Sequence, residues 1–124
     1  MKYTITVQEM LFHKIINDER RIDIHLLTKQ YQKIKLHEII EYKTSTGQST
    51  LRHVRGIGFF ENIYDLAASV PSEMFGYDNP EEIIVRFNRQ HSKEQQKDFN
   101  ILALFIDELR PIVSEQIREA KTRL

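Results

Sequence analysis

The pattern of apolar and polar positions changes period several times along the chain, and each change marks a new predicted element. Tyr3, Ile5 and Val7 alternate with polar residues and predict an opening strand over residues 1–7. Residues 8–17 instead place apolar side chains three and four positions apart, which predicts a helix of about three turns. The chain therefore begins with a strand followed by a helix.

Residues 20–26 form the most informative stretch, because apolar and ionisable side chains alternate there with period two. Ile22, Ile24 and Leu26 predict one face packed on a core. The other face would present a cation, a carboxylate and an imidazole, and its members are Arg21, Asp23 and His25. Further strands are predicted over residues 38–43, 51–61 and 100–109, the last a near-continuous apolar run typical of a central strand.

Helix starts and glycines complete the predicted order. Asn62, Asn79 and Ser92 each precede a helical pattern as an N-cap, and Pro80 follows Asn79 at the first helical position. Two glycines, at positions 56 and 58, interrupt the strand over residues 51–61 and predict a bulge or bend where a small barrel closes. The alternative is a close approach of the backbone to a ligand.

Composition bounds the class of protein. A chain of 124 residues with 40% hydrophobic residues predicts one domain with one modest core. The formal net charge is zero, which argues against binding duplex nucleic acid by bulk charge. Residues 1–60 nevertheless carry ten Lys and Arg against six Asp and Glu, a charge of +4 that could form a modest basic face. The absence of cysteine excludes disulfides, and with no apolar run long enough for a membrane span we expect a cytoplasmic protein without a membrane partner.

The stretch around residues 18–38 resembles the motif of the ASCH domain, a small PUA-like β-barrel. That motif reads G-x-K-x-x-E-x-R, followed by a Gly-Asp pair that opens the next strand. On it, Asp18 stands at the glycine, Arg20 at the lysine, Asp23 at the glutamate and His25 at the arginine. The Gly-Asp pair falls on the residues His37 and Glu38.

The order of the predicted elements is also similar to the layout of ASCH proteins. The resemblance therefore implies an α+β fold, namely a PUA-like small mixed β-barrel flanked by short helices, over residues 1–109. Residues 110–124 would form a C-terminal helical extension. This helix is expected to dock on its own domain, and the alternative is a homodimer through it.

The resemblance implies binding of RNA or of a modified nucleotide or nucleoside in a basic cleft. Arg and Lys side chains would meet phosphates there, and Tyr31 could stack on a base. Five phenylalanines, at positions 59, 60, 87, 99 and 105, are instead expected to lie in the core. The predicted ligand-binding residues are Arg20, Arg21, Asp23, His25, Lys33, Lys35, Arg52 and Arg55.

An alternative function follows from the same resemblance, because some ASCH proteins are amidohydrolases acting on N4-acetylcytidine. Their motif lysine is the central catalytic group, and a glutamate lies after the glycine-bearing strand. Here Arg20 stands at the lysine and Glu73 in the region of the glutamate, and Asp23 is the third candidate catalytic residue. A guanidinium stays protonated and cannot act as a base, so Asp23 would be the base while Arg20 holds a carbonyl or phosphate. A protein-interaction module is the further alternative.

The five histidines show no standard metal-ligand spacing, so neither a metal nor a cofactor is expected. His25, His37 and His53 could converge if the strands pair as predicted. Separate surface imidazoles are the favoured interpretation.

Overall fold

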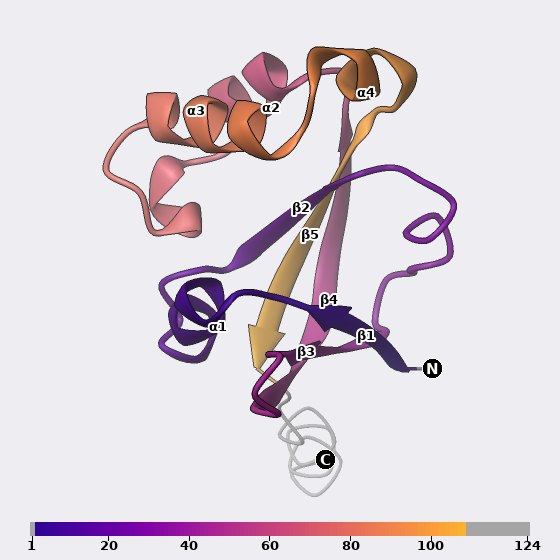
Figure 1. The fold of residues 1–124 in the computed structure, drawn as a ribbon, viewed down its shortest axis with the longest axis vertical. Helices are drawn as coiled ribbons and strands as arrows, with labels where there is room; N and C mark the ends of the chain where they lie inside the picture. The colour runs from indigo at the N-terminus through magenta and orange to yellow at the C-terminus, as the bar shows by residue number, and fades with distance from the viewer. Residues whose placement is uncertain (1, 109–124) are drawn as a thin grey trace, which may run out of the picture.

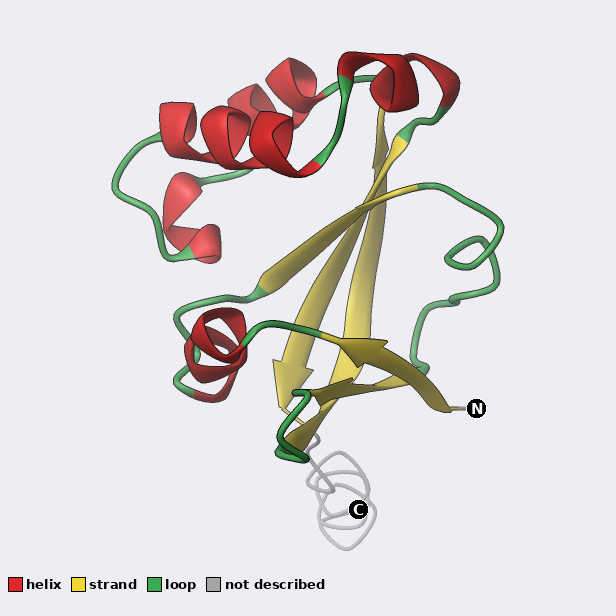
Figure 2. Ribbon diagram, viewed as in Figure 1, coloured by secondary structure: helices red, strands yellow, loops and turns green. Residues whose placement is uncertain are grey.

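A computed structural model describes residues 2–108 of the chain (Figures 1 and 2). The predicted C-terminal helical extension, residues 110–124, with its docking and dimer roles, lies outside the described residues. The elements run in the order β1 (Lys2–Thr6), α1 (Glu9–Ile16), β2 (Ile22–Leu26), β3 (Ile39–Lys43), β4 (Ser49–Phe60), α2 (Ile63–Ser69), the 3₁₀ turn η1 (Ser72–Phe75), α3 (Pro80–Gln90), α4 (Lys93–Asp98) and β5 (Ile101–Glu108).

The strands form one mixed, curled sheet in the order β1-β3-β4-β5-β2. β1 pairs with β3 in parallel, and the other neighbours pair antiparallel. β1 and β2 are therefore the two edges of the sheet, and in Figure 1 β1 passes in front of β4 while β2 lies above it. The predicted α+β small mixed barrel is confirmed, as a half-barrel whose two edges are not hydrogen-bonded to each other.

Two apolar cores lie on opposite faces of this sheet. The outer core packs the sheet against α2, η1 and α3, which gather at one end of the molecule in Figure 2. The inner core fills the concave side together with α1. β5 contributes to both, with Ile101 and Ala103 in the outer core and Leu102, Leu104 and Ile106 in the inner core. This double burial explains the near-continuous apolar run of the central strand.

The bulge predicted from the paired glycines is present. The register of β4 against β5 shifts between Val54 and Gly56. A Cβ added at Gly56 would lie 3.2 Å from the Phe105 ring, so a larger residue would push against β5. The predicted caps are confirmed too, since the side chains of Asn62, Asn79 and Ser92 each accept a backbone N–H three residues later.

Several predicted features need correction. α1 has eight residues, so it is shorter than predicted, and β2 begins at Ile22 rather than at residue 20. Phe59 is 63% exposed and Phe99 is 37% exposed, so these two are not core residues. No helix among residues 2–108 is long and apolar enough to cross a membrane.

Candidate functional site: a basic pocket between the edges of the sheet

A pocket of about 470 Å³ lies between the two edge strands, where the half-barrel stays open. β1 and α1 form one wall, the C-terminal half of α3 forms another, and β2 with the residues just before it supplies the polar centre. Arg20, Asp23 and His25, three of the predicted site residues, all line this pocket. The stretch singled out in the sequence therefore faces a real concavity.

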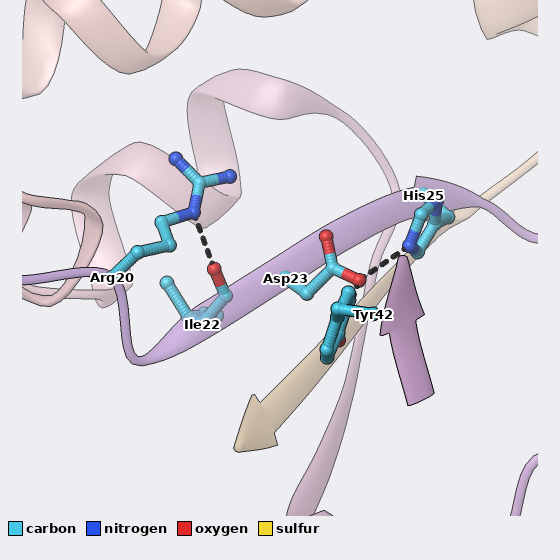
Figure 3. Close-up of polar contacts among 5 residues, drawn as sticks. All are labelled: Arg20, Ile22, Asp23, His25 and Tyr42. Carbon is cyan, nitrogen blue, oxygen red and sulfur yellow. Dashed lines mark hydrogen bonds and ion pairs between the residues drawn. The ribbon is translucent and has the colours of Figure 1, made fainter. Parts of the chain in front are cut away.

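Asp23 is the buried carboxylate of the pocket, with 3% of its surface exposed. Tyr42, itself fully buried on β3, donates its hydroxyl to Asp23 Oδ2 at 2.8 Å across the barrel interior. His25 Nε2 lies 2.7 Å from the same oxygen (Figure 3). Both contacts from described residues end on Oδ2, so Oδ1 has no such partner and is left for a ligand donor. The curl of the sheet covers this side of β2 and so buries Asp23.

The charge state of Asp23 is set by opposing effects. Burial alone would raise the pKa of Asp23. The positive charge of His25 and its hydrogen bond, then the charge of Arg20 and the Tyr42 hydroxyl, outweigh burial and lower the pKa below its ordinary value. The pKa of Tyr42 is raised well above its ordinary value by burial and by the neighbouring Asp23 charge. The pocket thus holds an ionised carboxylate beside a neutral phenol.

His25 and Tyr31 form one end of the pocket. Their rings stack with centroids 4.0 Å apart and planes 17° from parallel. Tyr31 lies on the long connection between β2 and β3, which is held at Lys33 by a 2.7 Å hydrogen bond from the Tyr3 hydroxyl. The stacked pair is a flat, partly polar wall beside Asp23, a surface on which a planar ring can lie.

Arg20 is buried at the opposite side of Asp23, with 8% of its surface exposed. Its Nε donates to the carbonyl oxygen of Ile22 at 2.6 Å, and its Nη1 donates to the Tyr77 hydroxyl at 3.3 Å (Figure 3 shows the first bond). The guanidinium also lies 4.8 Å from the centroid of the Phe75 ring. Within the described residues Nη2 has no hydrogen-bond partner, and it is not one of the buried unsatisfied atoms, so it stays open to the pocket.

Tyr77 gathers further cations at this end of the pocket. Lys14 Nζ and Arg86 Cζ each lie 4.9 Å from its ring centroid, and Arg89 lines the same cavity. These residues, together with Tyr42 and Tyr77, were not predicted from the sequence. Arg86 and Arg89 are three positions apart on α3, a spacing that could have indicated one helix face.

The other predicted cations lie elsewhere. Arg21 and Arg55 are exposed and line a second concavity, of about 480 Å³, together with the acids Asp18 and Asp107. Arg52 is buried and donates to the carbonyl oxygens of Leu51 and Ile15 and to the Thr50 hydroxyl, so it ties β4 to the end of α1.

Three further predicted residues are exposed and are not among the described residues that line the basic pocket. Lys33 and Lys35 lie on the connection between β2 and β3. Glu73 lies on η1. The structure thus brings together Arg20, Asp23 and His25 but places the predicted catalytic glutamate apart from them.

The histidines do not converge on one point. His37 and His53 meet with ring centroids 5.6 Å apart, while His25 pairs with Asp23 in the pocket. Among residues 2–108 no group of three or more histidine, aspartate or glutamate side chains is arranged to hold a metal ion.

Backbone geometry supports the alignment with the ASCH motif. Asp18 has φ of 59° and His37 has φ of 71°, and they are the non-glycine residues with positive φ in the described chain. These are the two positions that align with the glycines of the motif. Glycine adopts this left-handed conformation most readily, whereas other residues adopt it at a cost. Both positions therefore have the backbone conformation that glycine adopts most readily.

Comparison with solved structures supports the same fold. The crystal structure of hypothetical protein PH0355 superposes with a TM-score of 0.77 at 21% identity, covering 88% of this chain and all of the other. The solution structure of PF0455 from Pyrococcus furiosus gives 0.70 at 20% identity, over 89% and 99% of the two chains. ASCH from Zymomonas mobilis gives 0.56 at 10% identity, over 86% and 67%. No protein-family model and no curated protein matches the sequence.

Fold and pocket together define a small α+β domain with an open half-barrel. The particular fold is that of the ASCH domain, as the motif around residues 18–38 predicted. At these sequence identities the likeness concerns the fold.

Proposed function

We propose that the protein binds RNA or a modified nucleotide, with one nucleotide unit entering the basic pocket. The observation that carries this proposal is the buried Asp23 carboxylate, held ionised with Oδ1 unpaired beside the stacked rings of His25 and Tyr31. An ionised carboxylate accepts hydrogen bonds from the ring or amino N–H groups of a base, and aromatic rings stack on its face. Cations on the opposite side suit the sugar-phosphate portion.

The test is binding of the four ribonucleosides, their monophosphates and a short single-stranded RNA, measured by calorimetry and by fluorescence anisotropy. Wild-type protein is expected to bind at least one of them, and Asp23→Asn is expected to lose that binding. Lys97→Gln, on the exposed surface of α4, serves as the control that retains it. Binding that survives Asp23→Asn, or no binding by the wild type at millimolar ligand, would exclude the proposal.

A second candidate function is favoured by the 2.7 Å contact between Asp23 and His25. A carboxylate that holds an imidazole is a common arrangement for general acid–base catalysis. In its neutral form His25, held by Asp23, would take a proton from a water that attacks the acetyl carbonyl of N4-acetylcytidine. It would return the proton to the exocyclic nitrogen as the C–N bond breaks, with release of acetate. Glu73 takes no part in this version.

Incubation with N4-acetylcytidine, followed by chromatography for cytidine, tests the second candidate. Release that is lost in both Asp23→Asn and His25→Gln supports it. If neither the wild type nor Arg20→Lys releases cytidine although the protein binds the compound, the hydrolase candidate is excluded and only the binding function remains.

A further inference from the structure

The end of the pocket around Tyr77 has a strong excess of positive charge. Four described lining residues are Lys or Arg, namely Lys14, Arg20, Arg86 and Arg89, and Asp23 is the acid among them. The whole chain has equal numbers of cations and acids, so this excess is local. Arg86 has a partner, Glu82 at 3.8 Å, on the exposed side of α3. No ion pair with a described carboxylate engages Lys14 or Arg89.

Arg20 gives a second, independent indication of an anion site. Burying a guanidinium is costly unless its charge and its donors are satisfied. Here the charge faces Asp23 without a direct hydrogen bond, and Nη2, which has no hydrogen-bond partner in the described chain, is not one of its buried unsatisfied atoms and so stays open to the pocket. An oxyanion in the pocket would accept a hydrogen bond from this open donor and balance the charge of a side chain that is otherwise buried.

We propose that this end of the pocket, defined by Lys14, Arg20, Arg86 and Arg89, binds a phosphomonoester. The ligand is then a nucleoside monophosphate or an RNA end that carries a terminal phosphate, rather than a nucleoside or an internal residue of RNA. This inference rests on the proposed function and specifies its ligand.

Charge favours a monoester over a diester. A phosphomonoester carries close to two negative charges near pH 7, whereas a diester carries one. Four cations facing one carboxylate match the dianion better, and guanidinium groups bind phosphate through paired N–H donors. The base would then lie toward Asp23, His25 and Tyr31 at the other end, so the two ends recognise different parts of one ligand.

The experiment compares inorganic phosphate, nucleosides, their 5′- and 3′-monophosphates, and a five-residue RNA with and without a terminal phosphate, by calorimetry at two salt concentrations. The preferred monophosphate is expected to bind about tenfold tighter than its nucleoside, and this difference in affinity, the phosphate gap, should be smaller at high salt. Arg86→Gln with Arg89→Gln should remove most of that gap and leave nucleoside affinity unchanged. Lys97→Gln should change neither, and circular dichroism verifies that each variant is folded.

Each outcome separates the subsite from the proposed function. If nucleosides bind and their monophosphates bind no tighter, the subsite is wrong and the proposed function stands. The same holds if the phosphate gap persists in the double variant. If no nucleoside, nucleotide or RNA binds, the proposed function is wrong. The subsite is then decided by inorganic phosphate, whose binding must occur and must be lost in the double variant. Tighter binding of phosphorylated RNA than of any mononucleotide assigns the site to RNA ends.

Discussion

Two concavities of almost equal size differ in nearly everything else. The basic pocket measures about 470 Å³ and the second concavity about 480 Å³, and residues next to each other in sequence, Arg20 and Arg21, line one each. The second concavity balances Arg21 and Arg55 with Asp18 and Asp107. The basic pocket instead buries a carboxylate and a guanidinium at its centre. Size therefore says little about function here, and the burial of charge distinguishes the two.

The comparison also shows how one short segment serves both faces of a sheet. Alternation along β2 sends Ile22 and Leu26 to the outer core, while Asp23 and His25 face the interior of the half-barrel. Arg20 lies before the strand begins, so it is free of that alternation and folds back over Ile22. The turn at Asp18, with its positive φ, sets this approach.

The largest expected effect comes from Asp23→Asn, which removes the buried negative charge facing Arg20 and His25. Because a buried cation would lose its counter-charge, the free energy of unfolding should fall by about 3 kcal/mol, measured by urea denaturation. Asp18→Asn makes the same chemical change in the second concavity. Asp18 is exposed and asparagine tolerates its left-handed backbone, so a change below about 0.5 kcal/mol is expected. If both variants lost the same free energy of unfolding, the burial of charge would not distinguish the two concavities.

Lowering the pH should reduce the difference in the free energy of unfolding between the wild type and Asp23→Asn. The pKa of Asp23 in the folded protein lies below its ordinary value, so the unfolded chain takes up this proton first as pH falls. The stabilisation is complete above the ordinary pKa of about 4 and is lost as pH drops through the lower folded value. Urea denaturation of both proteins between pH 7 and pH 3 measures this. A constant or widening difference would show that Asp23 is not held ionised.

A smaller loss is expected from Tyr42→Phe, which deletes the buried hydroxyl that donates to Asp23 Oδ2. Removing one hydrogen bond to a charged, buried acceptor should reduce the free energy of unfolding by about 1–2 kcal/mol. Tyr64→Phe is the matched control, because Tyr64 is 62% exposed on α2. No loss in Tyr42→Phe would mean that the bond across the barrel contributes little to holding the pocket together.

The smallest effect is expected from the pair Arg21→Gln and Arg55→Gln in the second concavity. Nucleotide or RNA affinity should change by less than about twofold at moderate salt, since exposed charges are screened and these two lie outside the basic pocket. The measurement is the same calorimetric titration. A loss as large as that of Arg86→Gln with Arg89→Gln would show that the ligand extends onto this second surface.

Much of the fold could be predicted from local pattern, but the pocket only in part. Period-two alternation located β2 and grouped Asp23 with His25, and turn chemistry located the caps at Asn62 and Asn79. The burial of Asp23 could not be predicted, because it depends on the curl of the sheet. Tyr42 lies 19 residues away on a strand that is not adjacent to β2, so no local pattern links the two.

The charge of the pocket was harder still to predict. Dividing the chain into a basic and an acidic half directed attention to the first half. Arg86 and Arg89 come from residues 61–124, the half with net negative charge, and line the pocket from α3 together with residues of β2. Net charge over a long segment averages away such a local excess.

The place of β5 in the sheet has a consequence for how the protein comes into being. Every described residue that lines the basic pocket precedes residue 91, yet β2 is joined to the described sheet through β5, which begins at Ile101. A nascent chain that ends before this strand would carry all the binding groups without the partner that fixes their strand. Such long-range pairing is also slow to form. We therefore expect that a chain stalled at residue 100 does not bind, and that binding capacity appears abruptly once β5 has been made.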